Sequence, residues 1–205
     1  RNANEGGMPL SPDMETVNPA FFDYCDQKID YLVRAGIVPC IVGMWGYHLK
    51  EMSVERAQRY WRYLIARYCA YPVFWCAAGE AAMPWYLSGT PQQDTEFLRK
   101  GWSVVAAHIR EKDPYRNPVT IHPRKFSRED VDKPNYLDFE LIQVGHGDMD
   151  SLPITIDAVR KAISTVPVMP VVMAELNYEG ILGKCWRHVQ RLGFWHSVLN
   201  GAAGF

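Results

Sequence analysis

The sequence predicts an α/β fold built on a parallel sheet, and more specifically an incomplete (β/α)8 barrel, the TIM barrel. Short apolar, β-branched segments alternate with amphipathic segments at intervals of roughly 25–35 residues. With 205 residues, 48% of them hydrophobic and 22% charged, the chain has the length and composition of one globular domain. The glycines of residues 43–46 and 145–147 lack the spacing of a phosphate-binding turn, which disfavours a dinucleotide-binding fold.

Five short apolar segments are the predicted strands. They cover residues 37–43, 73–77, 119–121, 141–144 and 168–173. The first and last are almost continuously apolar, which is typical of strands buried on both faces of a parallel sheet. Because proline cannot donate to a sheet ladder, we place Pro39 and Pro170 at the starts of their strands. Cys40 and Cys76 lie inside two of these segments and are expected to be small buried side chains.

The segments between the strands predict helices. Asn18 followed by Pro19 is a helix start, and this helix is expected to end at Gly36. Ser53 begins a second helix with an apolar stripe at three- and four-residue spacing. The same spacing predicts helices over residues 94–110, 153–163 and 184–199. Strand and helix therefore alternate along the chain.

Charge and composition exclude several classes of function. Lys and Arg number 22 and Asp and Glu 23, so the net charge of -1 argues against nucleic acid and polybasic membrane surfaces as partners. The longest apolar run, residues 166–174, has about half the length of a membrane span. Aromatic residues make up 13% of the chain, which fits a large core and also a cleft where rings stack on sugars. We expect four tryptophans in the core or between helices: Trp61, Trp75, Trp102 and Trp186.

Side chains capable of chemistry follow every predicted strand. In chain order they are Trp45, Tyr47 and His48, then Glu80, then His122, then His146 and Asp148, and finally Glu175 and Tyr178. Barrel enzymes build their active sites at the carboxyl ends of the strands. This pattern therefore predicts an active site at that end of the sheet.

Glu80 and Glu175 are the predicted catalytic pair. Each follows an apolar strand directly, which would place both carboxylates at the mouth of the barrel. Two such carboxylates can divide the roles of acid/base and nucleophile in cleavage of a glycosidic bond, with about 5–5.5 Å between them in a retaining enzyme. The structural alternative is two glutamates that stabilise the N-terminal ends of helices.

The histidines support a second interpretation, a metal-dependent hydrolase in which His48, His122 and His146 converge on a metal ion. The sequence contains neither an H-x-H pair nor HExxH, so we expect no metal and no other cofactor. The three histidines are then predicted, together with Trp45 and Tyr178, to bind the substrate. A third interpretation is a carbohydrate-binding or catalytically silent barrel.

Several motifs resemble the apiosidase-like glycoside hydrolases, a (β/α)8 family formerly catalogued as a domain of unknown function. The resemblance implies a retaining glycoside hydrolase acting on a plant or other complex polysaccharide, with Glu80 as acid/base after strand four and Glu175 as nucleophile after strand seven. The family usually has Gly-Gly-Asp where this chain has Ala78-Gly-Glu80, which places the acid one methylene farther out. The motifs, in family order over about residues 15–205, are Asn18-Pro-Ala-Phe-Phe22, Gly36-Ile-Val-Pro39, Met44-Trp-Gly46, Ala78-Gly-Glu80, Gly145-His-Gly147, Glu175-Leu-Asn-Tyr-Glu-Gly180 and Gly201-Ala-Ala-Gly204.

The resemblance also implies how the chain fits into the barrel. Strands one and two would precede residue 1 and the last strand would continue past Phe205. Residues 1–205 are therefore expected to form a single catalytic domain, truncated at both ends, with about strands three to eight. We expect sequence outside this chain to supply the missing strands. The resemblance suggests a bacterial periplasmic or secreted protein, with carbohydrate as its partner.

Overall fold

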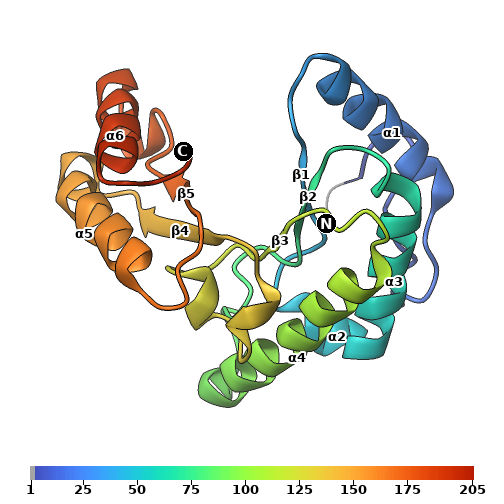
Figure 1. Cartoon of the computed structure of the whole chain (residues 1–205). Helices are drawn as coiled ribbons and strands as arrows, with labels where there is room; N and C mark the ends of the chain where they lie inside the picture. Colours follow the sequence, from blue (N-terminus) through green and yellow to red (C-terminus); the bar gives the residue numbers. More distant parts are fainter. Residues whose placement is uncertain (1–2) are drawn as a thin grey trace.

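The computed structural model describes residues 3–205 and has an α/β architecture with parallel strands (Figure 1). One sheet has the order β1 (Cys40–Val42), β2 (Phe74–Cys76) and β3 (Val119–Thr120). The second sheet pairs β4 (Glu140–Gly145) with β5 (Val171–Leu176). Every strand pair within the two sheets is parallel, which confirms the predicted α/β class.

The two sheets continue each other as part of a barrel. Asp138, just before β4, donates its backbone N–H to the carbonyl of Val119 on β3 at 2.7 Å. Within residues 3–205, β1 has a single neighbouring strand, and β5 pairs only with β4 and, through an isolated bridge from Val172, with Gly204. The barrel is therefore partial, while the numbering of its strands as three to eight stays a prediction.

Two helices begin where the sequence predicts. The backbone N–H of Ala20 donates to Asn18 Oδ1 at 3.2 Å and caps α1 (Pro19–Arg34). Ser53 Oγ accepts a hydrogen bond from the N–H of Arg56 at 3.4 Å at the start of α3 (Val54–Tyr68). Both side chains satisfy backbone donors that the helix itself leaves unpaired.

The remaining predicted helices are confirmed with small shifts of their ends. They are α4 (Pro91–Lys112), α5 (Ser151–Ser164) and α6 (Arg187–Leu199). The short helix α2 (His48–Met52) occupies a segment for which the sequence predicted no helix. In Figure 1, α5 and α6 lie with β4 and β5 on one side, and α1, α3 and α4 lie with the first sheet on the other.

The first predicted strand is shorter and more exposed than expected. Only residues 40–42 form β1, and Val42 is 52% exposed because β1 lies at the edge of its sheet. Cys40 is exposed for the same reason, which corrects the expectation that it is buried, whereas Cys76 on the central strand β2 is buried. Pro39 and Pro170 directly precede β1 and β5, as predicted.

A cluster of tryptophans organises the larger of the two main hydrophobic cores. Trp61 and Trp75 are fully buried and meet edge to face, with ring centroids 5.8 Å apart. Trp102 is equally buried, and its indole N–H donates to the carbonyl of Gly46 at 3.1 Å. The prediction that Trp186 lies in the core or between helices is wrong. Trp186 lies in the loop before α6 and is 54% exposed.

The second core lies between β4, β5 and α5. It contains Ile142, Val159 and Met173, all almost fully buried. Because all the strands run in parallel, the loops that follow them meet at one end of the two sheets. No helix of the described part of the chain has the length and apolar character required to cross a bilayer.

Candidate active site

Three hydrogen-bond donors surround the carboxylate of Glu175 on β5. The Tyr178 hydroxyl donates to Oε1 at 2.5 Å, and His146 Nε2 lies 3.3 Å from the same oxygen. His122 Nε2 lies 3.2 Å from Oε2. Both imidazoles therefore lie in close contact with the carboxylate. The donors come from the loops after three different strands.

Burial and hydrogen bonding keep two of these donors uncharged. Burial lowers the pKa of His122 below its ordinary value of 6.5, and the nearby charges of Glu175 and Glu80 only partly oppose this effect. The hydrogen bond to Glu175 raises the pKa of Tyr178 to about 12. Both groups therefore reach the carboxylate as neutral donors at neutral pH.

Glu80 has an unusual backbone conformation. It follows β2, and its backbone φ of 43° lies in the left-handed region that residues other than glycine rarely adopt. The N–H of Ala81 donates to the carbonyl of His122 at 3.0 Å, and the N–H of Met83 donates to the carbonyl of Glu80 at 2.9 Å. Backbone strain of this kind concentrates at functional sites, where the surrounding structure holds it in place.

Gln143 on β4 contacts Glu80 and was not among the predicted site residues. Its Nε2 donates to Glu80 Oε1 at 3.4 Å, and the pairing of β4 with β5 is irregular at this residue. A bulge of this kind re-aims a side chain next to an active site. The signal in the sequence was a single amide within the apolar run of residues 141–144.

Three buried polar atoms of this cluster have no hydrogen-bond partner among the described residues. They are Gln143 Oε1, His122 Nδ1 and His146 Nδ1. Buried polar groups are nearly always paired in folded proteins. Their concentration around Glu175 and Glu80 distinguishes this cluster from an ordinary part of the core.

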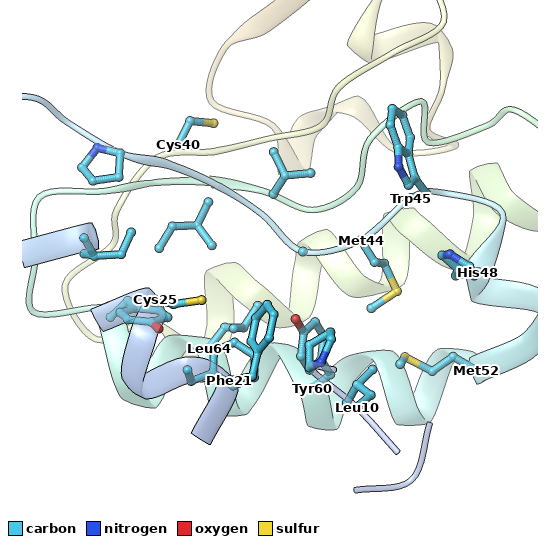
Figure 2. Close-up of a pocket in the computed structure, with 18 of the residues that line it drawn as sticks. Leu10, Phe21, Cys25, Cys40, Met44, Trp45, His48, Met52, Tyr60 and Leu64 are labelled. Atoms are coloured by element: carbon cyan, nitrogen blue, oxygen red, sulfur yellow. The ribbon is translucent and has the colours of Figure 1, made fainter. Parts of the chain in front are cut away.

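Trp45 and His48 lie on the other side of Glu80. The Trp45 ring covers Gly79, since a Cβ atom at Gly79 would lie 2.9 Å from Trp45 Cε3. His48 Nδ1 lies 2.9 Å from Glu51 Oε2. Trp45 and His48 both line an apolar cavity of about 590 Å³ between α1 and β1, where Figure 2 shows them at the opposite end from Cys25 and Cys40. His122, His146 and Tyr178 do not line this cavity.

Asn177 is a second residue that the sequence analysis missed. It is buried, its Oδ1 accepts the N–H of Asp148 at 3.0 Å, and its Nδ2 donates to the carbonyl of Asp148 at 3.1 Å. The N–H of Cys185 donates to Asp148 Oδ1 at 2.9 Å. This network ties the loop carrying His146 to the loop carrying Tyr178, so it positions both donors.

The carboxylates and imidazoles of this cluster do not form a set of metal ligands. Among residues 3–205, no group of three or more His, Cys, Asp and Glu side chains is placed to hold a metal ion. The chemistry within reach is carboxylate chemistry supported by neutral donors.

A family model decides the relationship. The model of the Apiosidase-like catalytic domain matches residues 1–205. The chain belongs to the Apiosidase-like family. This confirms the resemblance drawn from the motifs. A search of curated proteins finds no match to this Apiosidase-like chain.

Solved structures of glycoside hydrolases share the fold of the Apiosidase-like chain. A glycoside hydrolase family 5 protein from Bacteroides vulgatus aligns with a TM-score of 0.76 and 21% identity, over 98% of this chain and 47% of that one. Ruminococcus gnavus β-glucuronidase aligns with a TM-score of 0.53 and 12% identity, over 87% of this chain and 34% of that one. For Bifidobacterium dentium β-glucuronidase complexed with coumarin-3-O-glucuronide, the TM-score is 0.51 and the identity 19%, over 85% of this chain and 30% of that one. The chain thus spans less than half the length of these structures, and the likeness concerns the fold alone.

Proposed function

We propose that this chain is the catalytic part of a retaining glycoside hydrolase that cleaves a glycosidic bond in a plant or other complex polysaccharide. The observation that carries the proposal is the Glu175 carboxylate, which Tyr178, His122 and His146 hold from three loops. A nucleophile must present one oxygen to a carbon in a defined direction, and fixed donors provide that orientation. Family membership supports the same reaction class.

In the first step, Glu175 attacks the anomeric carbon and forms a glycosyl ester while the bond to the leaving oxygen breaks. Glu80 donates its proton to that oxygen, so the leaving group departs as a neutral alcohol. In the second step, Glu80 removes a proton from water, and the resulting hydroxide equivalent attacks the anomeric carbon. The ester bond breaks, and the two glutamates return to their starting protonation states.

The geometry around Glu80 supports its assignment as acid/base. Its carboxyl oxygen accepts a hydrogen bond from Gln143, whose own side-chain oxygen is buried without a partner among residues 3–205. The strained backbone at Glu80 holds the side chain at the strand end. For a retaining reaction we expect about 5–5.5 Å between the carboxyl groups of Glu80 and Glu175, whereas about 6.5–9.5 Å would favour inversion.

The proposed substrate-binding residues are Trp45, His48, His122, His146 and Tyr178. His122, His146 and Tyr178 contact Glu175 directly, which supports their assignment beside the proposed reacting carbon. The half-exposed ring of Trp45 covers the residue before Glu80 and offers a stacking face. The imidazole of His48 contacts Glu51 on α2.

Two variants test the division of labour. Glu175→Gln should lower kcat by at least about 10³-fold on every glycoside, because no other group can form the intermediate. Glu80→Ala should impair natural glycosides far more than aryl glycosides with activated leaving groups, which need little protonation. Added azide should restore turnover of the activated substrates by the Glu80→Ala variant.

Glu111→Gln, on the exposed surface of α4, is the matched control and should retain full activity. Equal losses at Glu80 and Glu175 on both kinds of substrate would contradict the assigned roles. Full activity of the Glu175→Gln variant would end the glycosidase proposal for this pair. Glycan binding without any hydrolysis by the unmodified protein would favour a carbohydrate-binding barrel instead.

We further propose that strands from sequence outside this chain cover the free edge of β1. The edge is apolar and exposed at Val42, and the cavity of Figure 2 lies directly behind it. Exposed sheet edges of this kind pair readily with added strands. Amide hydrogen exchange of residues 40–42 should slow when the flanking sequence is included, and unchanged exchange would refute the proposal.

A further inference from the structure

A row of aromatic rings lies on the two neighbouring loops that follow β1 and β2. The ring centroid of Tyr47 lies 5.1 Å from that of Trp85, which lies 5.7 Å from that of Tyr86. Trp85 is 48% exposed and Tyr86 73% exposed. We refer to Tyr47, Trp85 and Tyr86 as the aromatic row. None of the three is among the side chains that contact Glu175, and none lines the cavity of Figure 2.

The loop that carries Trp85 is fixed at both ends. The N–H of Ala82 donates to the buried carboxylate of Asp130 at 3.4 Å. At the other end, Ser88 Oγ donates to the buried Asp94 at 2.6 Å, and the N–H of Ser88 donates to the carbonyl of Trp85 at 2.9 Å. A loop held in this way presents its rings in one orientation and loses little conformational entropy when a ligand stacks on them.

The loop that carries Tyr47 interlocks with the Trp85 loop. A Cβ atom at Gly46 would lie 2.3 Å from the carbonyl oxygen of Ala81, so the two backbones are in direct contact. The indole N–H of Trp102 donates to the carbonyl of Gly46. The contact between Tyr47 and Trp85 therefore belongs to a rigid framework, although half of the Trp85 ring remains open to solvent.

The chemistry of this surface fits a sugar. An exposed, fixed aromatic face stacks on the apolar C–H face of a sugar ring, and a phenol beside it can hydrogen-bond a hydroxyl group. The nearby carboxylate of Asp94 is paired with Lys50 at 2.5 Å, so this ion pair adds no net charge to the region. An uncharged glycan matches both features.

We propose that the aromatic row binds the sugar on the leaving-group side of the scissile bond. This assignment rests on the proposed function, because Glu80 as general acid defines which side of the bond the leaving group occupies. The loop of Trp85 begins at Glu80, and Trp85 lies five positions beyond it. A glycan chain that leaves the acid on this side meets the row next.

Binding measurements test the row without requiring turnover. The Glu175→Gln protein is titrated calorimetrically with a panel of uncharged cello-, xylo-, manno- and galacto-oligosaccharides, with and without a second substitution. Trp85→Ala should weaken the binding of at least one oligosaccharide by about 10-fold, while Trp85→Phe should retain most of the affinity. Trp195→Ala removes a tryptophan of similar exposure from α6 and should change the affinity by less than about two-fold.

Kinetics then separate this inference from the proposed function. On the active protein, Trp85→Ala should reduce kcat/KM for an oligosaccharide about 10-fold more than for a 4-nitrophenyl glycoside, which has no sugar on the leaving side. If aryl glycosides are hydrolysed but Trp85→Ala and Trp195→Ala bind every oligosaccharide equally, the row is not a subsite and the hydrolase remains. If binding depends on Trp85 but no glycoside is hydrolysed, the leaving-group assignment is overturned.

Discussion

The Tyr178 hydroxyl lies 2.5 Å from Glu175 Oε1, so a residue three positions after the proposed nucleophile donates directly to it. This contact is local and needs only the turn that follows β5. His122 and His146 reach the same carboxylate from distant parts of the chain, after β3 and β4. The site therefore combines one contact set by local sequence with two set by the parallel arrangement of the strands.

Removing the Tyr178 hydroxyl tests that local contact. We expect Tyr178→Phe to lower kcat on aryl glycosides by about 10–100-fold, because a hydrogen bond to a charged group is worth about 1.5–3 kcal/mol. The phenyl ring can still occupy the half-exposed position of Tyr178, so the melting temperature should change little. Tyr115→Phe, at a tyrosine 64% exposed before β3, is the control, and equal losses in both variants would refute the role.

The buried imidazole of His122 makes stability depend on pH. Its pKa is lowered below 6.5 in the folded state, so the unfolded chain binds the proton more tightly. The stabilisation is fully present above pH 6.5 and is lost as the pH falls through the folded pKa. In His122→Gln, the melting temperature should fall less between pH 7.5 and 5 than in the unmodified protein. His188→Gln, at an exposed histidine on α6, controls for the loss of a histidine, and the same slope in all three proteins would contradict the prediction.

The close approach of Gly46 to Ala81 predicts a large effect of one methyl group. Gly46→Ala would bring a Cβ atom within 2.3 Å of a backbone oxygen, which cannot rotate away. We expect the free energy of unfolding in urea to fall by about 1–3 kcal/mol. Gly89→Ala places its Cβ in open space and should change the stability by less than about 1 kcal/mol. Similar stabilities of the two variants would show that the loops do not interlock.

Asn177 should affect both stability and catalysis. Asn177→Ala leaves the N–H and the carbonyl of Asp148 without their partner, which should cost about 1–3 kcal/mol in urea unfolding. Because Asn177 links the loops of His146 and Tyr178, kcat should fall more than KM changes. Asn135→Ala, at an exposed position, is the control. Lost stability with unchanged kcat would limit Asn177 to a structural role.

Local chemistry in the sequence was sufficient for the helix starts and for the approximate positions of the strands. The Asn18 cap, the Ser53 cap and the prolines before β1 and β5 act on the nearest backbone, so they are readable without a fold. Glu80 and Glu175 became the proposed catalytic pair because a carboxylate directly after an apolar segment stands out against it. The family motifs were sufficient for the membership that the family model confirms.

Only the tertiary structure decided the exposure of β1 and Trp186, the partners of each site residue and the parts of the site that sequence reasoning missed. Apolar sequence alone cannot say whether a strand has one neighbour or two, and β1 has one within the described residues. Gln143 contacts Glu80 at a point where the pairing of β4 with β5 is irregular. Asn177 forms a hydrogen bond with Asp148, which lies 29 positions away in the sequence. Such contacts depend on how separate strands are placed in space, which residue spacing along one chain does not encode.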